Sequence, residues 1–215
     1  MALLSAVPMQ KVYDHYAERE LIHQRLLNLL EQQKDEDFAQ LAVGVSDPRA
    51  NYSASEYGGG VLILQRSSAR AIFDLAKELY DCTHPKHIPD IIYNHAIGYL
   101  KISVGSEISM MLRPNDFWVA NVRTIWAYLL IKHAYNLKLA NEELMLYKDG
   151  ERDSEMDYAL WSEMHRLLET SQVHLHDLGV EEAQNQKTRI GKMKYLWADA
   201  IANELYVQRS HRFKR

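Results

Sequence analysis

The stretch GGGVLILQRSSARAIFDLAKELYDCTHPKHIPDIIYNHAIGYLK, residues 58–101, decides the predicted fold. Three glycines lead into a short apolar run at 61–65, which glycine and serine bound on either side, as they commonly bound a strand. Ser67 or Ser68 is then placed to cap a helical pattern that lasts to about residue 80. A turn at 83–87 that contains a proline precedes a second helical pattern over 88–100. The stretch therefore predicts the order strand, helix, turn, helix.

This order is the layout of a ribbon-helix-helix unit, in which two subunits pair their strands and the ribbon enters the major groove of DNA. Alternation along the predicted strand puts Leu62 and Leu64 on the core side and Val61, Ile63 and Gln65 on the outer side. A lone strand leaves its backbone groups unpaired, so the hypothesis requires a homodimer.

The predicted contacts with double-stranded DNA follow from this layout. Ile63 offers apolar contact, for example with thymine methyl groups, and Gln65 offers hydrogen bonds to a base edge. Four basic side chains are placed to contact phosphates at the ribbon end and at the start of the second helix: Arg66, Arg70, Lys86 and His87.

A second strand candidate leaves the position of the ribbon open. Over 106–113, Ile108, Met110 and Leu112 alternate with more polar residues, among them Ser109 and Arg113, and the run ends at a proline. This alternation is cleaner than that of 61–65, so 107–113 is the alternative ribbon.

The rest of the chain reads as helices. Helical spacing of apolar residues predicts helices over about 9–36, 115–135, 142–147, 155–178 and 193–207, and Gly179 is placed to end the fourth of them. The expected fold class is mostly α with minor β. The expected organisation is an N-terminal helix and arm (1–57), the ribbon-helix-helix unit (58–103) and a helical dimerisation or interaction region (104–215).

Composition and charge limit the function classes. The 215 residues are 47% hydrophobic and carry a net charge of −4, so a nucleic-acid surface must be local. Residues 141–182 hold 12 acidic and 3 basic residues, whereas 183–215 hold 8 basic and 2 acidic residues. The single cysteine, Cys82, and the lack of an apolar run of about 20 residues favour a cytoplasmic protein without a membrane span. The apolar N-terminus reads as an arm rather than a signal peptide.

Enzymatic and metal chemistry have little support in the sequence. There is no G-x-S-x-G elbow, P-loop or G-x-G-x-x-G fingerprint, so we expect no catalytic residues and no cofactor. Cys82, His84 and His87 could supply three metal ligands, but no fourth ligand is evident and a polar turn is the simpler interpretation. We therefore expect no metal site.

The run LILQRSSARAIF, residues 62–73, resembles the strand-to-helix segment of the AcaB-like family of ribbon-helix-helix regulators. These proteins are found on conjugative plasmids and integrating conjugative elements. The later run TRIGKMKYL, residues 188–196, is similar to the C-terminal segment of that family. The resemblance implies a homodimeric transcriptional regulator that activates conjugative-transfer genes.

The sequence-level hypothesis is therefore a sequence-specific DNA-binding regulator whose C-terminal helices add dimer interface or bind another regulatory protein. The alternative is a helical protein–protein interaction module without DNA contact. Such a module would use either the leucine-rich second half of the first helix or the acidic 141–182 face as its docking surface.

Overall fold

The computed structural model describes residues 3–55, 58–147 and 154–210, and within these ranges every regular element is a helix. Two short 3₁₀ turns, η1 (Pro48–Ala50) and η2 (Pro85–His87), lie between α-helices. The α-helices are α1 (Met9–Glu31), α2 (Asp35–Ala42), α3 (Tyr52–Ser55), α4 (Gly59–Arg66), α5 (Ala69–Asp81), α6 (Ile88–His95), α7 (Ile102–Leu112), α8 (Val122–Lys132), α9 (Leu137–Tyr147), α10 (Ser154–Asn185) and α11 (Lys194–Ser210). The described residues thus form an all-α fold.

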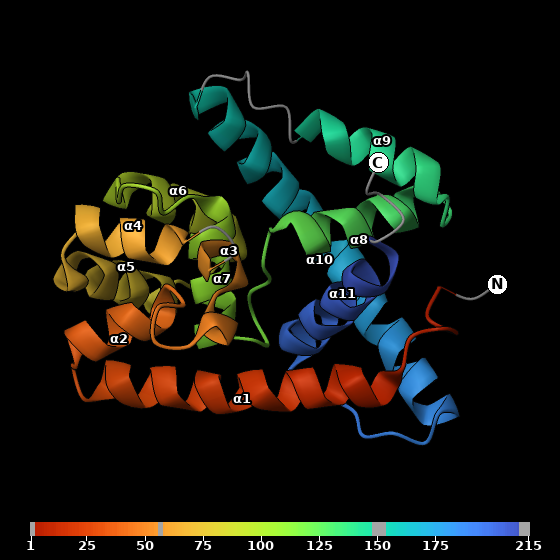
Figure 1. Ribbon diagram of the computed structural model, residues 1–215. Helices are drawn as coiled ribbons and strands as arrows, with labels where there is room; N and C mark the ends of the chain where they lie inside the picture. The colour runs from red at the N-terminus through yellow and green to blue at the C-terminus, as the bar shows by residue number, and fades with distance from the viewer. Residues whose placement is uncertain (1–2, 56–57, 148–153, 211–215) are drawn as a thin grey trace.

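Helix α1 runs along one side of the molecule, and two groups of helices lie on it (Figure 1). Helices α2 to α7 lie over its C-terminal half, whereas α8 to α11 lie toward its N-terminal half. Helix α7 packs on α1 and on members of both groups, namely α3, α5 and α6 of the first and α10 and α11 of the second. It is therefore the central helix of the fold.

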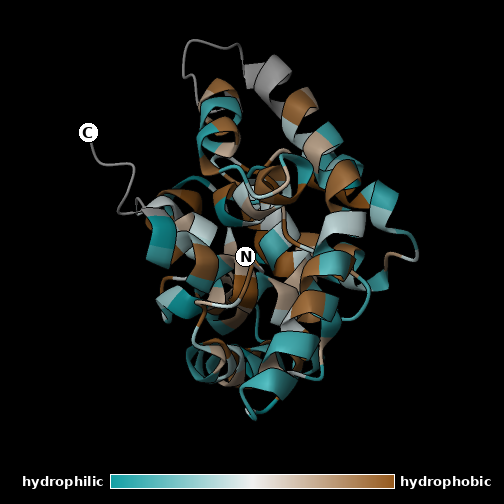
Figure 2. Cartoon of the chain, turned by 90° about the vertical axis from the view of Figure 1, so that its right-hand side faces the viewer, coloured by the Kyte–Doolittle hydropathy of each residue, from teal (hydrophilic) through white to brown (hydrophobic). Residues whose placement is uncertain are grey.

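The burial of α7 explains its unusual sequence. Every residue from Val104 to Leu112 is buried, so the helix has no solvent-facing side. Gly105 allows α6 to approach closely, because a Cβ atom there would lie 2.6 Å from the Ile92 side chain. Elsewhere, hydrophobic residues face the inside of the helix assembly and hydrophilic ones predominate at its lower edge (Figure 2).

The predicted ribbon at 61–65 is wrong, because these residues belong to α4. A five-residue apolar run fits a strand and a buried helix equally well, and here tertiary packing decides for the helix. Gly60 and Ile63 share a buried helical face, and Ile63 is 0% exposed. A Cβ atom on residue 60 would lie 2.2 Å from the Val43 carbonyl oxygen, so the glycine lets α4 pack against the end of α2.

The alternative ribbon at 107–113 is also wrong, because residues 107–112 lie in α7. The alternation that suggested a strand arises from polar side chains buried inside the fold. Ser109 Oγ donates to the Ser106 carbonyl at 2.8 Å, and Ser106 Oγ accepts from the Ala120 N–H at 3.0 Å. Since both strand candidates are helical, the expected class of mostly α with minor β and its embedded ribbon-helix-helix unit are corrected to all-α.

Other predicted helices are found with changed bounds. Helix α5 matches the pattern that ends near residue 80, and Ser68 Oγ caps it by accepting from the Ala71 N–H at 3.1 Å. The helix predicted over 9–36 ends at Glu31, and Gln33 takes a left-handed φ of 54° before α2 starts. Gly179 does not end α10, because it serves as a packing site: a Cβ atom there would lie 2.1 Å from the Ile201 side chain.

None of the helices in the described ranges combines the length and the apolar character needed to cross a bilayer.

Candidate functional site

A buried cluster of charges lies where the two groups of helices meet. Arg19, at the middle of α1, donates to Glu107 of α7 at 2.7 Å and is also paired with Asp199 of α11. All three side chains are almost completely buried. Glu107 additionally accepts from the backbone N–H groups of Tyr52 and Ser53, each at 3.0 Å, and so orients the start of α3.

Burial and the neighbouring charges shift the pKa values in this cluster. Burial opposes the charge of Arg19, but Asp199 and Glu107 hold its pKa above the ordinary arginine value. Burial raises the pKa of Asp199 to about 6, against the opposing effect of Arg19. Burial, together with the positive charges of Arg19 and Arg123, lowers the pKa of His15 to about 3. His15 is therefore neutral at pH 7, and its ring stacks on Tyr52.

The cluster explains how one helix holds both halves of the molecule in register. A buried cation with two buried carboxylates is costly to desolvate, so such a group favours one arrangement of its helices over alternatives. Arg19 is the common partner of α7 and α11, so it links α1 to both groups of helices.

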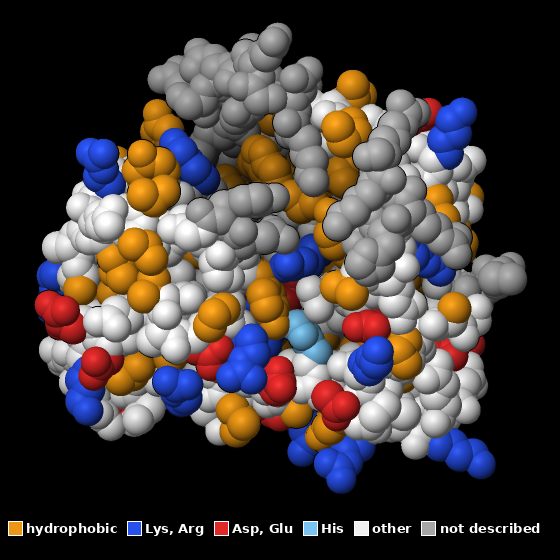
Figure 3. All heavy atoms as spheres, viewed as in Figure 1, with side chains coloured by type: hydrophobic (Ala, Val, Ile, Leu, Met, Phe, Trp, Pro, Cys, Tyr) orange, Lys and Arg blue, Asp and Glu red, His pale blue; other side chains and the backbone are white. Residues whose placement is uncertain are grey.

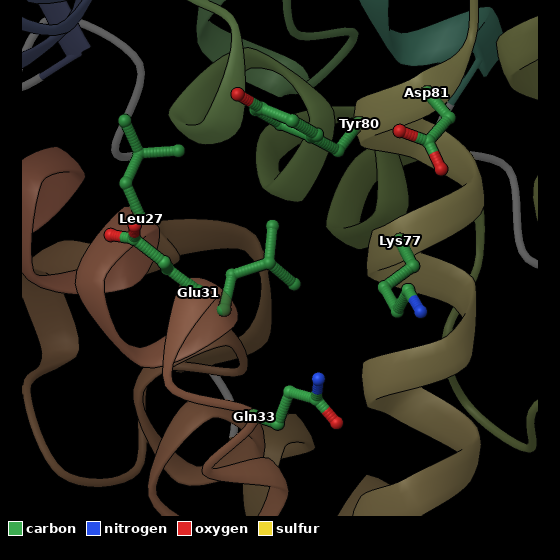
Figure 4. A pocket seen from close by; sticks show the side chains of 7 residues that line it. Leu27, Glu31, Gln33, Lys77, Tyr80 and Asp81 are labelled. Atoms are coloured by element: carbon green, nitrogen blue, oxygen red, sulfur yellow. The ribbon is translucent and has the colours of Figure 1, made fainter.

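A hollow of about 480 Å³ lies between the C-terminal half of α1 and the second half of α5 (Figure 4). Both helices pack on α2 and α7 rather than mainly on each other, which keeps the two walls apart. Tyr80 extends from α5 toward α1 at one end, and Gln33 lies at the other. The lining residues are Leu27, Leu30, Glu31, Gln33, Lys77, Tyr80 and Asp81.

A second hollow of about 440 Å³ continues the first toward the end of α7. Leu27 and Tyr80 line both, so the two hollows are neighbours, and we call the pair the α1–α5 groove. Its remaining lining residues are His23, Leu112, Arg113, Pro114, Asn115, Asp116 and Met193. Leu27, Leu30 and Met193 are partly exposed, and Tyr80 is 41% exposed, so the groove opens to solvent.

His23 lines the second hollow and is held in place by a hydrogen bond to the backbone of α7. Its Nδ1 atom lies 2.7 Å from the Met111 carbonyl oxygen, and a carbonyl can only accept. Nδ1 therefore carries a proton and donates it to this carbonyl. The residue is 7% exposed.

Charged side chains on the two walls of the groove differ in how they are engaged. Arg113 is held by Asp116 at 2.9 Å, by the carbonyls of Tyr80 and Cys82, and by the ring of Phe117. By contrast, Glu31, Lys77 and Asp81 make no ion pair within the part of the chain that the structure describes. Glu31 lies on the α1 wall, and Lys77 and Asp81 lie on the α5 wall (Figure 4).

The residues predicted to contact DNA are not brought together on one ribbon. Ile63 is buried inside the fold, so it cannot contact a base. Gln65 and Arg66 lie at the exposed end of α4, and Arg70 at the start of α5 pairs with Asp74 at 3.0 Å. Lys86 and His87 are exposed but lie beyond the other end of α5, a helix of 13 residues that is about 20 Å long.

The charge pattern on one face of the molecule is mixed. In Figure 3, Lys and Arg side chains are interspersed with Asp and Glu rather than gathered into one basic area.

Cys82 is one of the three potential metal ligands in the turn at 82–87, and its thiol donates to the His84 carbonyl oxygen at 3.2 Å. Within the described ranges, no three His, Cys, Asp or Glu residues are grouped in a way that could hold a metal ion.

Sequence reasoning missed the α1–α5 groove as a site. The signal that pointed toward it was the leucine-rich second half of the first helix, since Leu27 and Leu30 line the groove. Nothing in the sequence assigns the other wall, because Lys77 and Tyr80 lie in a predicted helix and Asp81 directly follows it. Comparison of the chain with protein-family models, with curated proteins and with solved structures gives no match.

Proposed function

We propose that this protein is a helical protein–protein interaction module that binds a short amphipathic helix of a partner in the α1–α5 groove. The observation that carries this proposal is that two neighbouring hollows share Leu27 and Tyr80 as lining residues. Adjacent hollows between two helices, with leucine, tyrosine and methionine among their lining, are the kind of surface in which an amphipathic helix can bury its apolar face.

The form of the partner segment follows from the fold. An extended peptide commonly binds by adding a strand to a sheet edge, but the described residues contain no strand. A helix needs only side-chain contacts with the two walls, and apolar residues at positions i, i+3 or i+4, and i+7 would face Leu27, Leu30 and Tyr80. The groove therefore suits a helical segment better than an extended one.

The DNA-binding regulator is the weaker candidate, because its structural premise is absent from the described residues. Residues 61–65 form part of α4, so the argument for a paired ribbon and for an obligatory dimer no longer applies. A role in regulating conjugative-transfer genes rested on the family resemblance alone. We therefore favour the interaction module over the DNA-binding regulator.

The test uses a display library of helical peptides with a fixed apolar stripe and randomised remaining positions, selected on the full chain. We expect enriched peptides that bind the wild type and lose at least tenfold in affinity for Leu27→Asp, because the charge would be placed against a buried apolar contact. Tyr80→Ser, a change on the opposite wall at an exposed side chain, is expected to weaken binding as well. The matched control is Leu21→Asp on the same helix, at a residue that is 63% exposed and does not line the groove.

The outcomes separate the candidate functions. If the library yields no binder, or if its binders tolerate Leu27→Asp and Tyr80→Ser as well as Leu21→Asp, the proposed module is wrong. A gel shift with random-sequence duplex DNA at two salt concentrations is run in parallel. Retention that falls steeply with salt would favour the DNA-binding alternative instead.

A further inference from the structure

The outer face of α9 exposes an apolar surface. Leu139, Met145 and Leu146 are 43–64% exposed, and no other helix exposes as many large hydrophobic side chains among the described residues. Helix α9 lies at the outer edge of the second group of helices (Figure 1) and packs mainly on α8. We infer that this face binds a second copy of the chain, so that two α9 helices pack antiparallel about a two-fold axis.

The first step is to separate the inner face of α9 from the outer one. Ala140 and Leu144 are buried against the fold, and Trp126 Nε1 of α8 donates to the Asn141 side chain at 2.8 Å. These contacts fix the inner face. The exposed residues are spaced at helical intervals and share the opposite face: Lys138, Leu139, Glu142, Met145 and Leu146.

The second step is the order of charges on the outer face, which makes this face complementary to itself. Lys138 and Glu142 lie two residues on either side of position 140. Within one helix they are 3.8 Å apart and mostly exposed, so both can reach a partner. In an antiparallel pair with the two-fold axis beside position 140, each Lys138 faces Glu142 of the partner subunit. The dimer thus gains two ion pairs of the same kind, as two-fold symmetry requires.

The third step is the apolar contact that the same register makes. Leu139 is next to the two-fold axis and therefore lies against its own copy. Met145 and Leu146 lie against the turn that precedes α9 in the partner subunit, where Tyr135 is also exposed. One surface that complements itself in charge and in apolar pattern favours a second copy of this chain over an unrelated protein.

The size of the face limits the strength of the dimer. Helix α9 has 11 residues and is about 16 Å long. A stable interface buries about 800 Å² of each partner, which is more than one short helix face provides. We therefore expect a weak dimer, with a dissociation constant on the order of 100 μM. It differs from the obligatory dimer that a paired ribbon would require.

Sedimentation velocity of the full chain, from roughly 10 μM to 1 mM, tests whether the dimer forms. We expect the weight-average mass of the wild type to rise with concentration from that of one chain toward that of two. Leu139→Asp should dimerise at least tenfold more weakly, because two carboxylates would meet beside the axis. The matched control is Leu167→Asp, at a leucine of α10 that is 47% exposed, and it should dimerise as the wild type does.

Charge reversal tests the antiparallel register. Lys138→Glu and Glu142→Lys each place like charges at both contacts, so either variant alone should dimerise roughly tenfold more weakly than the wild type. An equimolar mixture of the two variants has opposite charges at both contacts and should dimerise as the wild type does. A mixture that stays monomeric would overturn the inference.

The remaining outcomes are equally decisive. A wild type that is monomeric at every concentration, or a Leu139→Asp variant that dimerises as well as Leu167→Asp, would also overturn the α9 dimer. Leu27→Asp should dimerise as the wild type does, because the α1–α5 groove is not part of this face. Loss of the dimer in Leu27→Asp would instead place the contact in the groove and contradict the inference.

Discussion

Replacing His165 with phenylalanine should remove part of the loss of stability that acid causes. The ring of His165 is fully buried in α10 and stacks on Trp118, with ring centroids 5.1 Å apart and planes 19° apart. Neither ring nitrogen has a hydrogen-bond partner among the described residues. Trp118 Nε1 donates to the backbone carbonyl of residue 165 at 2.7 Å, and this bond survives the substitution.

The magnitude follows from the pKa of the ring. Burial lowers the pKa of His165 to about 4, below the value of 6.5 expected in the unfolded chain. The unfolded chain thus takes up the proton first, so the contribution to stability is complete above pH 6.5 and is lost as the pH falls toward 4. Between pH 7 and pH 5 this linkage lowers the free energy of unfolding by about 2 kcal/mol.

The assay is urea unfolding followed by circular dichroism at pH 7 and pH 5 for the wild type and His165→Phe. At pH 7 the two should agree within about 1 kcal/mol, since phenylalanine keeps the stacked ring and loses no hydrogen bond. The free energy of unfolding of the variant minus that of the wild type should be about 2 kcal/mol larger at pH 5 than at pH 7. The acid response of His15 is common to both proteins and cancels. Equal changes from pH 7 to pH 5 would refute the neutral, buried imidazole.

Two further predictions test the scaffold. Arg19→Met should lower the free energy of unfolding by about 3–5 kcal/mol, because Glu107 and Asp199 would stay buried without their cation. The control Arg25→Met, at an arginine whose side chain is 57% exposed, should change it by less than about 1 kcal/mol in the same urea titration. Similar losses in the two variants would contradict the role given to the cluster. Gly60→Ala should lower the free energy of unfolding by about 1–3 kcal/mol, since its Cβ atom would meet the Val43 carbonyl oxygen. Gly98→Ala should lower it by less, because the nearest atom to its Cβ would lie at an ordinary contact distance of 3.5 Å. A Gly60→Ala variant as stable as the wild type would contradict the position of α4.

Local signals in the sequence predicted some helices well. The apolar stripe of α5 and its cap at Ser68 are local features, and both are found. The long apolar periodicity of the first helix likewise predicted α1, although its end was placed too late. These elements follow from spacing and capping, which neighbouring residues determine.

The errors arose where long-range packing decides the structure. Residues 61–65 have β-branched character, but Gly60 and Ile63 bury one helical face against α2 and its surroundings. In α7, Ser106, Glu107 and Ser109 produce an alternation of polar and apolar residues like that of a strand. These polar side chains are buried in a helix, and the partners of Glu107 and Ser106 lie far away in the sequence. Arg19 is 88 residues from Glu107 and 180 from Asp199, so no local sequence pattern predicts that they pair.

The groove was only half predictable for the same reason. The leucine-rich end of α1 suggested a docking surface, and Leu27 and Leu30 do line the groove. Its second wall depends on the packing of α5 against α2 and α7. The sequence of α5 alone does not predict that packing.

The most direct test of the central proposal is a methyl NMR titration of leucine-labelled protein with a peptide enriched from the helical library. We predict that the methyl signals of Leu27 and Leu30 shift on binding, while those of Leu21, exposed on α1, and Leu139, exposed on α9, do not. Shifts confined to Leu139 and Leu146 of α9, with Leu27 and Leu30 unchanged, would contradict binding in the α1–α5 groove.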